Sequence, residues 1–145
     1  MSDDVHVRVC DDSDLDALAF LNKQLIEDEN HDNTMGIDQL KARMQAFIHS
    51  GYVAYLFENN GEIIGYALAD HGRNPIYLRQ FFICRNVRRR GFGRRAFREL
   101  TGLLRSNTLE VEVLSWNEAG IGFWKSLGFE ERSICLRYHD GTDCQ

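Results

Sequence analysis

The chain has 145 residues, and its hydrophobic fraction of 43% and charged fraction of 27% are those of a soluble globular protein. This length gives one domain enough buried surface to fold without disulfide bonds, so we expect a single domain over 1–145. Its apolar runs are too short to cross a bilayer, and its net charge of -5 argues against a protein that coats nucleic acid.

The N-terminal segment, 1–12, is acidic and lacks the basic start and apolar middle of a secretory signal, so we expect a cytoplasmic protein. The four cysteines occur singly, without a C-x-x-C pair, which favours reduced thiols and predicts no metal site. They are Cys10, Cys84, Cys135 and Cys144.

The first elements follow from the spacing of apolar residues. Alternation over 5–9 predicts a strand with one buried face. Apolar residues recur every three or four positions over 15–26 and again over 37–48, which predicts two amphipathic helices. Gly51 is expected to close the second helix in the left-handed conformation.

The remainder of the chain alternates between strand and helix patterns. Strands 52–58 and 62–69 flank the turn residues Asn59, Asn60 and Gly61, and Gly128 is expected to cap the last helix. The further predicted elements are strand 76–84, helix 92–105, strand 109–115, helix 117–127 and strand 133–138. The order β-α-α-β-β-β-α-β-α-β indicates an α+β fold, with a mixed, mostly antiparallel central sheet flanked by helices.

Half of the 14 arginines lie in 85–98, around Gly91 and Gly93. A glycine-containing turn between a strand and a helix places free N–H groups and the positive end of the helix dipole at one point, which favours a pyrophosphate. A plain turn with solvated arginines is the alternative. The pattern Gly91-x-Gly93-x-x-Ala96 also matches the dinucleotide fingerprint, but the strands before it and the mid-strand position of Glu112 argue against that interpretation.

Two motifs resemble the GNAT acetyltransferase superfamily. The segment Arg88-Arg89-Arg90-Gly91-Phe92-Gly93 resembles its R/Q-x-x-G-x-G/A pyrophosphate loop, and 117–131, "NEAGIGFWKSLGFEE", resembles its distal N-x-x-A-x-x-F/Y-Y-x-x-x-G-F segment. The resemblance implies a GNAT-like fold and an enzyme that moves the acetyl group of acetyl-CoA directly to an acceptor amine. Acetyl-CoA would be the donor cosubstrate, and no metal would be needed.

The resemblance also implies the site residues. A backbone N–H at Phe82 or Ile83 would stabilise the oxyanion of the thioester. The coenzyme would contact the following residues: Phe82, Ile83, Arg85, Arg88, Arg89, Arg90, Gly91, Phe92, Gly93, Arg94, Asn117 and Phe123. Many relatives have a tyrosine at position 124 that protonates the leaving thiolate; here Trp124 leaves that role to water, Ser126 or Tyr138, or the thiolate leaves unassisted.

A general base must take a proton from the acceptor ammonium, and Glu112 is our first choice. Asp70, His71, Glu29 and His31 are the other candidates, and each could equally be a solvated residue. Because the acidic segment 26–33 lies where the family builds its acceptor pocket, we expect Glu29, His31 and Asp70 to contact a cationic small-molecule or peptide acceptor.

Two other classes of function stay open. A non-catalytic module that binds acetyl-CoA or CoA is compatible with Trp124 and with the absence of a carboxylate in 76–83. Nucleic-acid binding through the arginines, with Phe92 and Phe97 stacking on bases, is disfavoured by the net charge. A last strand at the edge of a sheet makes a homodimer plausible.

Overall fold

The computed structural model describes residues 3–30 and 32–142. The chain divides into two compact units, 1–114 and 115–145, and each is described by itself. No helix of the described residues is long and apolar enough to span a membrane.

The first unit is built on a five-stranded sheet in the order β1-β2-β3-β4-β5. The first four strands are antiparallel neighbours, and β5 lies parallel to β4. The hairpin between β2 and β3 turns at Asn60 and Gly61, whose φ angles of 51° and 82° are those that a two-residue turn requires. The strands are β1 (His6–Val9), β2 (Tyr52–Asn59), β3 (Glu62–Asp70), β4 (Ile76–Ile83) and β5 (Leu109–Val111).

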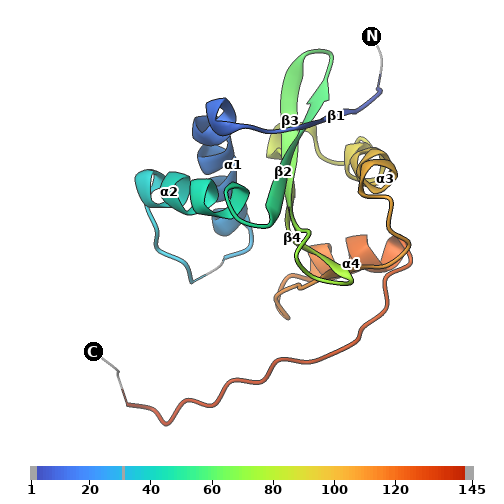
Figure 1. Cartoon of the computed structure of the whole chain (residues 1–145). Helices are drawn as coiled ribbons and strands as arrows, with labels where there is room; N and C mark the ends of the chain where they lie inside the picture. The colour runs from blue at the N-terminus through green and yellow to red at the C-terminus, as the bar shows by residue number, and fades with distance from the viewer. Residues whose placement is uncertain (1–2, 31, 143–145) are drawn as a thin grey trace. The chain divides into compact units, whose positions relative to one another are not determined.

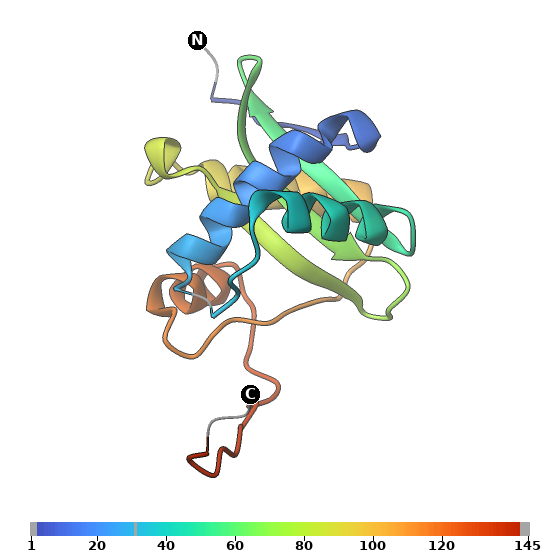
Figure 2. The same ribbon diagram turned by 90° about the vertical axis from the view of Figure 1, so that its left-hand side faces the viewer.

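Helices cover both faces of this sheet. Helices α1 (Leu15–Asp28) and α2 (Ile37–Ile48) lie on one face and α3 (Phe92–Leu104) on the other (Figure 1). Figure 2 looks onto the face that carries α1 and α2. Their apolar side chains pack against the strands, because the three- to four-residue spacing gathers them on one side of each helix. The buried cluster on this face includes Leu18, Met44, Leu56, Tyr66 and Phe82.

A short 3-10 turn, η1 (Asp12–Asp14), connects β1 to α1 and is tied back to the strand. The guanidinium of Arg8 donates two hydrogen bonds to the Asp14 carboxylate, at 2.9 and 3.1 Å. This interaction lowers the pKa of Asp14. Because Asp14 is 8% exposed, the ion pair is partly desolvated and contributes more than a surface pair would.

The second unit contains α4 (Glu118–Ser126), which begins at Asn117 and ends before Gly128. The Asn117 side chain accepts a hydrogen bond from the Gly120 N–H at 3.0 Å and so caps the helix. Gly128 has a φ of 100°, which confirms its role as the closing residue of α4.

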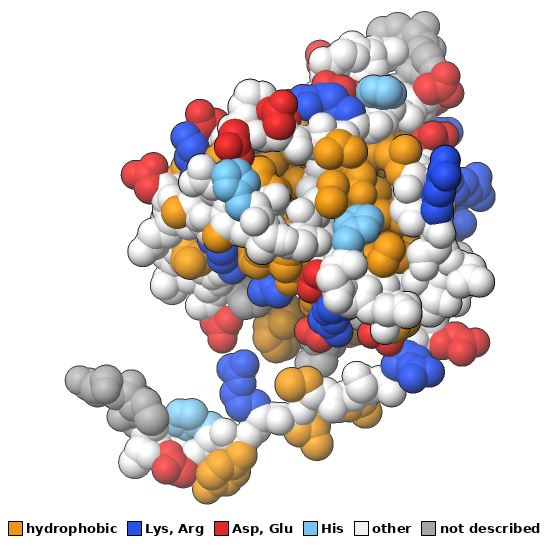
Figure 3. All heavy atoms as spheres, viewed as in Figure 1, with side chains coloured by type: hydrophobic (Ala, Val, Ile, Leu, Met, Phe, Trp, Pro, Cys, Tyr) orange, Lys and Arg blue, Asp and Glu red, His pale blue; other side chains and the backbone are white. Residues whose placement is uncertain are grey.

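Most predicted elements are confirmed, but the last predicted strand is wrong. Residues 129–140 have no regular secondary structure, and the apolar side chains of Ile134, Leu136 and Tyr138 are 81–88% exposed. Figure 3 shows hydrophobic side chains spaced along this terminal segment. The alternating pattern identifies a segment that suits a strand, but the hydrogen bonds of a strand also need a neighbouring strand, which a pattern cannot supply.

Two smaller predictions are also wrong. Strand β5 ends at Val111, so Glu112 follows the strand and is not in its middle. Helix α2 ends at Ile48, and Gly51 does not have a positive φ. The antiparallel strands that precede Gly91 still set this fold apart from a dinucleotide-binding β-α-β unit.

Candidate functional site

The turn between β4 and α3 presents unused backbone N–H groups. After β4 ends at Ile83, a 3-10 turn, η2 (Arg85–Val87), leads to Arg89 and Gly91, whose φ angles are 63° and 81°. Within the described residues, no hydrogen bond uses the N–H groups of residues 89–93. These groups converge at the positive end of the α3 dipole, which is a site suited to a phosphate.

Phe92 anchors the start of α3. Its side chain is 1% exposed, so only its backbone is accessible at the turn. The guanidinium groups of Arg90 and Arg95 lie 5.0 and 5.9 Å from the centre of its ring. Arg95 also donates a hydrogen bond to the Arg90 carbonyl at 3.0 Å. The packing of one aromatic ring therefore fixes both the helix end and two of the neighbouring cations.

Asp28, at the end of α1, pairs with both Arg85 and Arg88. Arg88 Nε donates a further hydrogen bond to the Ile83 carbonyl at 2.8 Å, and its guanidinium lies 5.2 Å from the centre of the Phe82 ring. The Asp28 carboxylate is therefore committed to arginines of the turn. This network joins the end of α1 to the end of β4, the strand on which the oxyanion donor was predicted.

Gly65 permits an unusually close approach of β3 to the end of β4. A Cβ atom at this position would lie 2.1 Å from the Phe82 carbonyl oxygen, a distance that no side chain could accept. Next to this contact, the Cys84 N–H donates to the Ile64 carbonyl at 2.7 Å. The course of β4 at Phe82 and Ile83 thus depends on the missing side chain of Gly65.

The predicted base Glu112 lies beside Tyr77. Burial, followed by the charge of Glu112, raises the pKa of Tyr77 to about 12. The register places Val111 opposite Leu78, five residues before Ile83. At the rise of an extended strand this is roughly 16 Å along β4 for Val111, and roughly 13 Å for Glu112, which is one residue nearer to Ile83. The backbone alone does not bring Glu112 to Ile83, so a role as base requires the acceptor or water to connect them.

Asp70 lies still further along β4 from Ile83. It pairs in register with Tyr77, six residues before Ile83, or roughly 20 Å along the strand. Its carboxylate accepts a hydrogen bond from the Gly72 N–H at 2.9 Å and so stabilises the turn. Neighbouring His71 is hydrogen-bonded to the Tyr55 hydroxyl at 3.0 Å. The structure does not gather Asp70 and Ile83 into one site.

Glu29 lies near a polar cluster that the sequence did not reveal. Burial raises the pKa of Tyr66 well above its usual value, while the charge of Arg43 opposes this shift and that of Glu29 adds to it. The Tyr66 hydroxyl donates to Gln80 at 2.7 Å, and Arg43 donates to the buried Asn22 at 3.2 Å. His31, the remaining predicted acceptor residue, lies outside the described residues.

The distal motif lies in the second unit. Trp124 packs edge-on against Phe123 and Phe129, with ring centres 4.9 and 5.0 Å apart. The Ser126 hydroxyl donates to the Phe123 carbonyl at 2.6 Å, as a helix-ending serine often does. Within this unit the indole of Trp124 therefore has a packing role, and the Asn117 side chain has a capping role.

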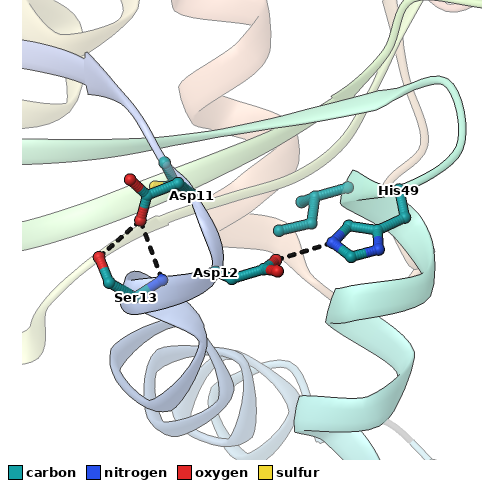
Figure 4. Close-up of a pocket in the computed structure, with 6 residues that line it drawn as sticks. Asp11, Asp12, Ser13 and His49 are labelled. Atoms are coloured by element: carbon teal, nitrogen blue, oxygen red, sulfur yellow. Dashed lines mark hydrogen bonds and ion pairs between the residues drawn. The ribbon is translucent and has the colours of Figure 1, made fainter.

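A separate open depression of about 570 Å³ lies in the first unit between the start of α1 and the end of α2 (Figure 4). The Asp12 carboxylate and His49 face each other across it at 2.8 Å, and Asp11 accepts hydrogen bonds from Ser13. Burial raises the pKa of the Cys10 thiol in its wall to about 12, so this thiol is a poor nucleophile. None of the predicted site residues lines it.

The residues of the β4–α3 turn fit a coenzyme A pyrophosphate, because free N–H groups, a left-handed glycine and several arginines occur together there. No group of three or more metal-ligating side chains lies together in 3–30 and 32–142.

Comparison with known proteins gives one family and one common fold. The family model described as "Acetyltransferase (GNAT) family" matches residues 17–129. The N-alpha-acetyltransferase RimI of Mycobacterium tuberculosis is 30% identical over 95 residues, and the match covers 63% of this chain and 59% of RimI. The chain thus matches less than two thirds of the length of that relative.

Two solved structures share the fold. The aminoglycoside N-acetyltransferase AAC(6')-Iy in complex with CoA has a TM-score of 0.73 at 17% identity, and the alignment covers 98% of each chain. A structure described as a "predicted acetyltransferase with acetyl-CoA from Clostridium acetobutylicum" has a TM-score of 0.72 at 15% identity, and the alignment covers 93% of this chain and 96% of that chain. These comparisons confirm the predicted fold class.

Proposed function

The chain belongs to the GNAT acetyltransferase family, and on that premise we propose that it transfers the acetyl group of acetyl-CoA to an acceptor amine. The observation that carries this proposal is the β4–α3 turn. Its N–H groups at residues 89–93 have no partner in the described chain, and Gly91 holds a left-handed conformation there. Free N–H groups at the start of a helix are a recurrent binding site for phosphate groups.

In this proposal the turn holds the donor and β4 orients it. The N–H groups of residues 89–94 bind the pyrophosphate, and the side chains of Arg88, Arg89, Arg90 and Arg94 add positive charge. The pantetheine arm runs along Ile83 to Arg85. Asn117 and Phe123 are proposed coenzyme contacts on grounds of the family motif alone.

The chemistry needs two protons removed from the acceptor nitrogen and one negative charge stabilised. A base takes a proton from the acceptor ammonium, and the free amine attacks the thioester carbonyl, forming the C–N bond. A backbone N–H at Phe82 or Ile83 stabilises the oxyanion, and the C–S bond then breaks. The second proton lost by the nitrogen passes through water to the departing thiolate, so that the thiol is released. Glu112 remains the proposed base, acting through water or a bound acceptor.

The sharpest test is acceptor-dependent release of CoA thiol from acetyl-CoA, measured with a thiol reagent against a panel of primary amines. We expect thiol release with at least one acceptor. With that acceptor, Glu112→Gln should have a lower kcat than the wild type. Acetyl-CoA binding without release from any amine would overturn the enzyme in favour of a non-catalytic CoA-binding module. The cytoplasmic location and the homodimer remain predictions of the sequence.

A further inference from the structure

Two arginines from different elements share one aromatic ring on the α1–α2 face of the sheet. Arg43, on α2, lies 5.5 Å from the centre of the Phe47 ring, and Arg79, on β4, lies 4.9 Å from it. Arg79 also reaches the Tyr52 hydroxyl at 3.4 Å. The fold therefore holds two guanidinium groups against one aromatic ring.

These two charges have no counterion in the described chain. Neither Arg43 nor Arg79 forms an ion pair with a carboxylate among residues 3–30 and 32–142. By contrast, Arg8, Arg85 and Arg88 are all paired with carboxylates. Burial and the charge of Arg79 lower the pKa of Arg43, which reflects the cost of this arrangement.

Two buried donors at the same place also lack acceptors. Arg43 Nε and Asn22 Nδ2 are inaccessible to solvent and have no partner at hydrogen-bond geometry within the described residues, although the Asn22 amide lies near enough to the Tyr66 hydroxyl to lower its pKa against the larger effect of burial. Asn22 is 1% exposed, and its Oδ1 accepts from Arg43 at 3.2 Å. Buried donors of this kind are rare in folded proteins, and a shift of the Arg43 side chain toward a ligand would relieve the unpaired Nε.

The cluster is close enough to the proposed thioester position to belong to the acceptor. Gln80, which accepts from Tyr66 at 2.7 Å, lies three residues before Ile83 on β4, or roughly 10 Å along the strand. The charge of Glu29 also acts on Tyr66, so a negative group lies near the same surface. A ligand with an amine at one end and an anion at the other matches the negative charge of Glu29 and the positive charges of Arg43 and Arg79.

We propose that Arg43 and Arg79, supported by the amide of Asn22, bind a carboxylate group of the acceptor, so that the acceptor is an amino acid or another amine bearing a carboxylate. This inference rests on the proposed acetyl transfer and names its substrate class. The guanidinium fork matches a planar carboxylate in two parallel hydrogen bonds, which makes arginine the residue suited to this task. Arg43 and Arg79 position the acceptor and take no part in the transfer of the acetyl group.

The test compares acceptors that differ only in the carboxylate. Glycine, β-alanine, 4-aminobutyrate and 6-aminohexanoate are each assayed beside the corresponding primary amide, with thiol release as the readout. We expect at least one acid to exceed its amide tenfold or more in kcat/KM, mainly through KM. Equal rates for every acid and its amide would overturn the carboxylate subsite while leaving the transferase intact. A stronger preference for an aminoalkyl phosphonate would overturn the choice of carboxylate.

Variants separate this subsite from the fold. Arg43→Gln and Arg79→Gln should each reduce the acid-to-amide ratio about tenfold and leave the affinity for acetyl-CoA unchanged. Lys41→Gln is the matched control, because it removes a positive charge from the same helix, but one already paired with Asp16 at 2.8 Å. An equal fall of the acid-to-amide ratio in Lys41→Gln would show that the overall charge of the protein causes the effect, and would contradict the proposal.

A binding experiment tests the subsite if no acceptor is turned over. N-acetylglycine and N-acetyl-β-alanine, with their amides, are titrated into the protein in the presence of CoA. Carboxylate-dependent binding that disappears in Arg43→Gln would retain the subsite even though the transferase had failed. Binding that is equal for acid and amide, or absent for both, would overturn it.

Discussion

Gly91→Ala probes the turn that carries the proposed function. Gly91 has a φ of 81°, a conformation that costs a residue with a side chain about 1–2 kcal/mol. The new Cβ would lie 3.5 Å from Arg95 Nη1, an ordinary contact, so the turn itself imposes no steric clash. The cost is therefore conformational.

This cost should appear in the affinity for acetyl-CoA. If the turn of the free variant relaxes to avoid the strain, binding must restore the left-handed conformation, and the same 1–2 kcal/mol weakens the Kd about 5- to 30-fold. The added Cβ also obstructs the approach of a phosphate to the backbone. Isothermal calorimetry of the wild type and the variant measures the change directly.

Gly61→Ala supplies a matched control for the strain. Gly61 has a φ of 82° in the hairpin turn, and a Cβ there would meet nothing within 4 Å. This variant should lose a similar 1–2 kcal/mol of unfolding free energy and bind acetyl-CoA as the wild type does. An unchanged Kd in Gly91→Ala, alongside the expected loss of stability in Gly61→Ala, would refute the assignment of the turn.

Three further predictions concern the support of the site and the assembly. Gly65→Ala should both lower the melting temperature and weaken acetyl-CoA binding, because its Cβ would lie 2.1 Å from the Phe82 carbonyl oxygen. A lower melting temperature with unchanged acetyl-CoA binding would show that this contact supports the fold but not the site. Asp14→Asn should destabilise the protein at pH 7. Because Arg8 lowers the folded-state pKa of Asp14, the wild-type advantage is present above pH 4 and is lost as the pH falls through the folded-state pKa. Urea unfolding over a series of pH values below 7 should therefore show a gap between the two proteins that narrows as the pH falls below 4, and a gap that does not change with pH would contradict the role of the carboxylate. Light scattering should give a dimer for the wild type and a monomer for Leu136→Glu, since Leu136 is 88% exposed in the single chain; a monomeric wild type would remove the predicted dimer.

The sequence predicted the β4–α3 turn because its signals are local. Gly91 and the strand and helix patterns on either side determine the backbone conformation within a few residues. The family motif also extends over this short segment, so the anion-binding turn could be located without a structure. The hairpin at Asn60 and Gly61 was predictable for the same reason.

The polar cluster of Asn22, Arg43, Tyr66, Arg79 and Gln80 could not be predicted in this way. These residues come from two helices and two strands, and each one alone resembles an ordinary helix or strand residue. Their meeting depends on the register of β3 against β4 and on the packing of α1 and α2. The one local indication of this cluster in the sequence was Asn22, a polar residue within the apolar pattern of α1.

In the acidic connection after α1, the sequence did not distinguish paired carboxylates from unpaired ones. The sequence suggested that its carboxylates would together favour a cationic acceptor. In the structure, Asp28 pairs with Arg85 and Arg88 of the turn, so its charge is already compensated. A run of like charges in the sequence does not reveal which of its members are neutralised by residues nearly 60 positions away.

Calorimetric titration of the purified protein with acetyl-CoA measures whether the β4–α3 turn binds the coenzyme. We predict one binding site per chain, with an affinity that weakens in Gly91→Ala and as salt is added, because the turn binds the phosphates through charge and N–H groups. Absence of binding, or binding insensitive to both changes, would show that the arginine-rich turn does not bind the coenzyme.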